Sequence, residues 1–94
     1  MNKGLIITLP QWDNVTEYLS QFSNLIIKEA EDKGIKTKTL NGKSVNKPNF
    51  EKVIKNLNYN FVVFNGHGSP SCIKGHKDEI IIEAGDNEDL LKGR

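Results

Sequence analysis

The apolar residues of this chain follow two alternating periods, and this alternation limits the possible folds more than any other feature. The run 5–8 is short and nearly continuously apolar, as is typical of a strand that is covered on both faces, and residues 59–64, with the apolar run 61–64, predict another strand. The run 36–40 alternates and is β-branched at two positions, which predicts a short strand near a sheet edge. Helical patterns separate the three runs. Strands joined by helices pair in parallel, so we predict an α/β sheet in which strand 5–8 lies between the other two.

Both predicted helices have an apolar stripe with spacings of three and four residues. Asn14 and Glu17 resemble a capping box at the start of the first helix, and Gly34 is suited to a left-handed residue just after its end. Pro48 fits the first turn of the second helix. The first stripe consists of Val15, Tyr18, Leu19, Phe22, Leu25, Ile26 and Ala30, and the second of Phe50, Val53, Ile54 and Leu57.

The last third of the chain predicts a β-hairpin. Two apolar pieces, 72–74 and 79–83, flank a polar turn that contains Gly75. Residues 87–92 have the pattern of the beginning of a third helix. We therefore expect residues 1–94 to form one three-layer α/β domain with a mainly parallel sheet and a projecting hairpin.

Composition excludes several classes of function. The 94 residues have a net charge of +1, so the chain has no electrostatic basis for binding nucleic acid or a membrane surface. The apolar stretch near the N-terminus is too short for a signal peptide or a membrane span. A single cysteine cannot form an internal disulfide, which fits a reducing compartment. We expect a cytoplasmic protein without a cofactor.

His67 is the main candidate for chemistry. It lies between Gly66 and Gly68, directly after the run 61–64, so it is delivered to the carboxyl edge of the sheet, where open α/β folds bind ligands. One interpretation is a catalytic imidazole, and the other is a side chain that fixes a turn by bonding a backbone carbonyl. Trp12 follows the first strand at the same edge, where it either lines a substrate cleft or caps the core.

The order of these elements, with the run 61–68 ending in His-Gly and followed by a hairpin, resembles the first half of a caspase-like cysteine peptidase. This clan includes the caspases, metacaspases, gingipains, clostripain and CHAT domains. The resemblance implies that His67 is the catalytic base and that the backbone N–H of Gly68 belongs to an oxyanion hole. It also implies a peptide or protein substrate. A thiol near an imidazole becomes a competent nucleophile, so the residue types suit this chemistry.

The chain departs from that pattern because the following strand, which bears the nucleophilic cysteine in this family, is absent. Cys72 lies five residues after His67, in the predicted hairpin, and is a poor substitute. We therefore expect an incomplete caspase-like domain that is inactive in isolation. The strand 59–64 would then lie at a sheet edge, where we expect it to bind the missing C-terminal half or to self-associate.

Two alternatives remain open. His67, Cys72 and His76 are close enough in sequence to suggest a metal site, but their spacing matches no common zinc pattern, and we expect no bound metal. The other alternative is a noncatalytic α/β interaction domain that acts through its sheet edge and hairpin.

Overall fold

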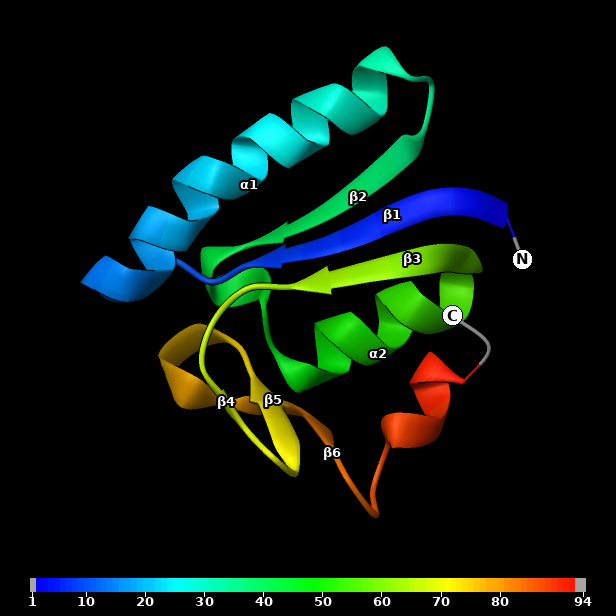
Figure 1. The fold of residues 1–94 in the computed structure, drawn as a ribbon. Coiled ribbons are helices and arrows are strands. Elements are labelled where there is room, and N and C mark those ends of the chain that lie inside the picture. The colour runs from blue at the N-terminus through cyan, green and yellow to red at the C-terminus, as the bar shows by residue number, and fades with distance from the viewer. Residues whose placement is uncertain (1, 93–94) are drawn as a thin grey trace.

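A three-stranded parallel sheet forms the centre of the protein, seen here in a computed structural model that describes residues 2–92. Strand β1 (Asn2–Leu9) lies between β2 (Lys36–Asn41) and β3 (Tyr59–Phe64), as Figure 1 shows. Residues 5–9 of β1 are buried, which explains the continuous apolar run. The predicted parallel pairing and strand order are confirmed.

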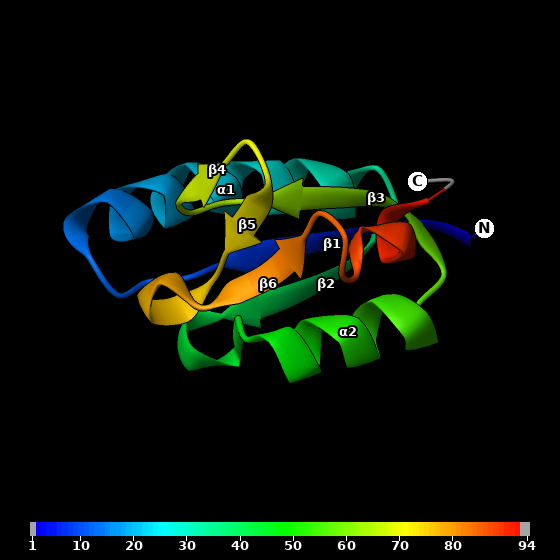
Figure 2. The same ribbon diagram turned by 90° about the horizontal axis from the view of Figure 1, so that it is seen from below.

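The two helices cover opposite faces of this sheet and give the predicted three layers. Helix α1 (Asn14–Asp32) lies on one face and α2 (Lys47–Asn56) on the other (Figure 2). Pro48 occupies the first turn of α2, and Gly34 follows the end of α1 with a φ of +75°, both as predicted. No helix within residues 2–92 has the length and the apolar content needed to cross a membrane.

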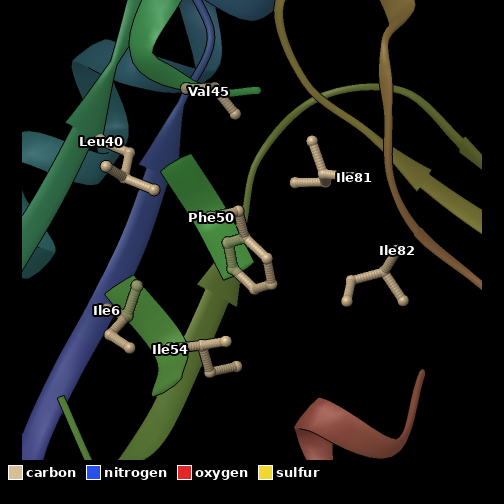
Figure 3. Packing of buried hydrophobic residues seen from close by; sticks show 7 residues of the cluster. All are labelled: Ile6, Leu40, Val45, Phe50, Ile54, Ile81 and Ile82. Carbon is tan, nitrogen blue, oxygen red and sulfur yellow. The ribbon is translucent and has the colours of Figure 1, made fainter. Parts of the chain in front are cut away.

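The larger core lies on the α2 face of the sheet. Figure 3 shows Phe50 and Ile54 of α2 among side chains from the sheet and from the C-terminal part of the chain. Its buried members are Ile6, Leu40, Val45, Phe50, Ile54, Ile81 and Ile82. A smaller cluster on the α1 face consists of Leu5, Ile7, Leu9 and Ala30.

Helix α1 turns most of its apolar stripe outward. An amphipathic helix ordinarily buries such a stripe. Here the buried residues of the helix are Thr16, Ser20, Ser23 and Ala30, of which only Ala30 belongs to the stripe, and Ile27 is partly buried against the cluster on this face. The exposed apolar residues of the helix are Val15, Tyr18, Phe22, Leu25 and Ile26.

The capping box of α1 is displaced by one residue from the predicted position. Asp13, and not Asn14, is the N-cap, and its partner is Thr16 in place of Glu17. The side chain of Asp13 accepts a hydrogen bond from the backbone N–H of Thr16, while the Thr16 side chain bonds the backbone N–H of Asp13.

The predicted hairpin is present and is extended by a third short strand. Strands β4 (Gly68–Ser69), β5 (Cys72–Lys74) and β6 (Ile80–Glu83) form an antiparallel sheet, with a 3-10 turn (His76–Asp78) between β5 and β6. This small sheet packs beside α2 through Ile81 and Ile82. Where a third helix was expected to begin, the chain forms a short 3-10 helix (Glu88–Leu91).

Candidate active site

The loops that follow β1 and β3 meet at one edge of the sheet because these strands are parallel neighbours. Asn65, the first residue after β3, binds the end of β1: its backbone N–H donates to the hydroxyl of Thr8, and its side-chain amide donates to the carbonyl of Thr8. Gly66 then adopts a φ of +134°, and a Cβ there would lie 3.1 Å from both Pro10 and the Lys74 carbonyl. The backbone therefore requires glycine at this point, immediately before His67.

His67 is hydrogen-bonded to Asp13. The distance from Nε2 of His67 to Oδ2 of Asp13 is 2.8 Å, although 54 residues separate the two in sequence. The pKa of Asp13 is lowered from 3.8 to about 2, so the carboxylate is ionised near neutral pH and accepts only. Nε2 of His67 must then hold a proton and donate it, so Nδ1 is the nitrogen that can accept a proton in the neutral tautomer.

The helix cap fixes the orientation of this carboxylate. Oδ1 of Asp13 accepts from the backbone N–H of Thr16 at 2.8 Å and from the Thr16 hydroxyl at 2.7 Å, which leaves Oδ2 for His67. The Thr16 backbone bond is the largest cause of the lowered pKa of Asp13, followed by the hydrogen bond to His67. The N-terminus of α1 thus presents a stable anion to the imidazole.

Asp13 was not among the residues predicted from the sequence. The signal was present, because the sequence placed Trp12 and His67 at one sheet edge and Asp13 is the next residue. Asp13 also caps helix α1, and this structural role is enough to explain an aspartate at this position. Its contact with His67 spans 54 residues, so no short sequence pattern predicts it.

Trp12 lies directly against His67. The two rings meet edge to face with centroids 5.9 Å apart, and Trp12 is half-buried. Its indole Nε1 is buried and has no hydrogen-bond partner among the described residues. Trp12 therefore packs against the His67 ring, while its contact with substrate stays a prediction.

Gly68 begins β4 and is exposed beside His67. The carbonyl of His67 accepts a hydrogen bond from the backbone N–H of Lys74 at 3.0 Å, which holds the loop against β5. A Cβ on Gly68 would lie 3.2 Å from the carbonyl oxygen of Cys72, so a side chain would fit poorly here. Its predicted role as an oxyanion donor stays a prediction.

Cys72 belongs to a different group of contacts. It pairs with Ser69 across β4 and β5, and its sulfur lies 3.1 Å from the Ser69 hydroxyl. His76 is held elsewhere, with its backbone N–H bonded to the carbonyl of Val45. Within residues 2–92, no three His, Cys, Asp or Glu side chains gather as metal ligands, so the structure contradicts the alternative of a site built from His67, Cys72 and His76.

Comparison of the chain with protein-family models, with curated proteins and with solved structures finds no match.

Proposed function

We propose that this protein supplies the general base of a caspase-like cysteine endopeptidase, with the nucleophilic thiol provided by a strand outside the described residues. The observation that supports this proposal best is the hydrogen bond between Asp13 and His67 at the carboxyl edge of the parallel sheet. An oriented imidazole with one free nitrogen is what a general base requires. The exposed Gly68 backbone beside it suits an oxyanion donor. A cytoplasmic location is part of this proposal.

In the proposed reaction, a thiol transfers its proton to Nδ1 of His67, and the thiolate attacks the carbonyl carbon of a peptide bond. The N–H of Gly68 donates to the oxyanion of the tetrahedral intermediate. The imidazolium then returns the proton to the amine as the C–N bond breaks, and an acyl-enzyme remains for hydrolysis by water. Asp13 stabilises the positive ring and keeps Nε2 protonated throughout.

An added small thiol tests the base without the strand that we propose to supply the nucleophile. We expect the chain to accelerate transfer of an acyl group from 4-nitrophenyl acetate to 2-mercaptoethanol. His67→Gln should reduce this catalysis at least about tenfold, because general-base contributions are of this size or larger. Asp13→Asn should also reduce it, since the ring loses its anionic partner.

His76→Gln is the matched control, because it removes the other histidine and leaves the Asp13–His67 pair in place. Its rate should equal that of the unchanged chain. Equal rates for His67→Gln and the unchanged chain would refute the proposed role of the imidazole.

A noncatalytic interaction domain is the second candidate function. Its support is the exposed apolar surface of α1 together with Phe61 of β3. Absence of thiol-dependent catalysis, combined with binding of a protein segment at this surface, would favour it.

A further inference from the structure

Helix α1 and strand β3 together expose an unusual amount of apolar side chain. Phe22 is 54% exposed, Leu25 is 67% exposed, and Phe61 is 65% exposed. With Val15, Tyr18 and Ile26, the exposed area reaches about 600 Å², taking roughly 150–200 Å² for each complete side chain. This is at the upper end of what monomers expose, and it approaches the roughly 800 Å² that each partner buries in a stable interface.

The two parts form one continuous surface. Ile26 and Ala30 of α1 line the same cavity of about 310 Å³ as Phe61 and Val63 of β3. We call this surface, made of the α1 stripe, the cavity and the outer edge of β3, the α1–β3 face.

The two edges of the parallel sheet differ in how well they are protected against pairing with another strand. Strand β2 has exposed Lys36 and Lys38, and charged side chains of this kind prevent an edge from pairing with another strand. Strand β3 has no charged residue, and Phe61 is exposed at its edge. The sequence therefore protects the β2 edge and leaves the β3 edge suited to pairing.

The arrangement of the layers indicates what would cover the α1–β3 face. Helix α1 packs over β1 and β2, which leaves β3 without a helix above it on the same face of the sheet (Figure 1). Packed helices lie 8–10 Å apart, which is about two strand spacings of roughly 4.8 Å. One added strand beside β3, with a helix in the α1 layer, fills this space.

A second copy fits less well. Two β3 strands that pair about a twofold axis normal to the sheet place both α1 helices on one face. At least three strand spacings, about 14 Å, would separate these helices, so they could not pack directly against each other. Such a dimer would cover the β3 edge and leave the α1 stripe exposed.

We propose that the α1–β3 face docks a β–α unit of another polypeptide segment: an apolar strand that pairs with β3, and an amphipathic helix that packs beside α1. This inference rests on the second candidate function, because it names the kind of segment that would bind the same exposed surface, and it does not depend on the chemistry of His67.

A fluorescent synthetic peptide tests this docking. The peptide has an apolar strand of about six residues, a short loop and an amphipathic helix of about 15 residues. Fluorescence anisotropy should give saturable binding in the micromolar range, and hydrogen exchange should slow at residues 61–64. Phe61→Lys and Leu25→Glu should each weaken binding at least about tenfold, since charge enters a buried contact.

Lys52→Glu is the matched control, because Lys52 is exposed on α2, on the other face of the sheet. It should change the affinity less than about twofold. The proposal is overturned if the peptide does not bind, or if Phe61→Lys and Leu25→Glu leave its affinity unchanged. It is also overturned if sedimentation shows a dimer that both substitutions dissolve, because the occupant would then be a second copy.

Discussion

Because the apolar stripe of α1 faces outward, replacing Phe22 of α1 by alanine should lower the free energy of unfolding much less than replacing Phe50 of α2. Phe50 is fully buried between α2 and the sheet, and Phe50→Ala should cost about 3–5 kcal/mol, as large-to-small changes in a core do. Phe22 is 54% exposed. A fully buried phenylalanine contributes about 1.5–3 kcal/mol, so Phe22→Ala removes about 0.7–1.4 kcal/mol of burial. The better helix propensity of alanine offsets about half of that loss.

Urea unfolding of the isolated chain, followed by circular dichroism, measures both changes in the free energy of unfolding. We expect Phe22→Ala to shift it by less than about 1 kcal/mol. The reciprocal change is Ser23→Leu, which inserts a large side chain at a position only 1% exposed and should cost about 1–3 kcal/mol. If Phe22→Ala is as costly as Phe50→Ala, or if Ser23→Leu is stabilising, α1 is rotated and the reasoning on the α1–β3 face fails.

Three further predictions concern the site. Gly66→Ala should destabilise the fold by about 1–3 kcal/mol in thermal unfolding, because alanine is strained at a φ of +134°, whereas a cost near zero would contradict that geometry. The lowered pKa of Asp13 adds stability that is fully present above pH 3.8 and is lost as the pH falls toward about 2, so acid unfolding of Asp13→Asn should be less steep in this window; an unchanged profile would contradict the lowered pKa that the bonds from Thr16 and His67 produce. The isolated chain should show no turnover on a fluorogenic peptide panel, and turnover that both His67→Ala and Cys72→Ala abolish would make Cys72 the nucleophile.

Much of the fold could be predicted because each element has a strong local pattern. The run 59–64 matches β3 at both ends, and Phe50 and Ile54 are buried as the stripe of α2 predicts. When the apolar residues of a strand or short helix face the core, their spacing in the sequence indicates both the type of element and the face that it buries. The strand order then follows from the helical connections.

The orientation of α1 could not be predicted from the same kind of pattern. The stripe of a helix shows which side is most apolar, and the sheet here packs on the side with the smallest residues. Ser20 and Ser23 carry little signal of burial in the sequence. Asp13 escaped prediction for a related reason, because its partner His67 is brought near only by the pairing of β1 with β3.

The carboxylate of Asp13 both caps helix α1 and orients His67, so two different requirements limit which residues can occupy position 13. A screen for folded protein would accept Asn, Ser or Thr at this N-cap, because each caps a helix well. A screen for an oriented imidazole would accept only a side chain with a second anionic oxygen, and glutamate is too long to keep the short cap geometry. The range of tolerated residues at position 13 should therefore narrow when the selection changes from folding to chemistry, and that narrowing would reveal the second role of Asp13 without any knowledge of the substrate.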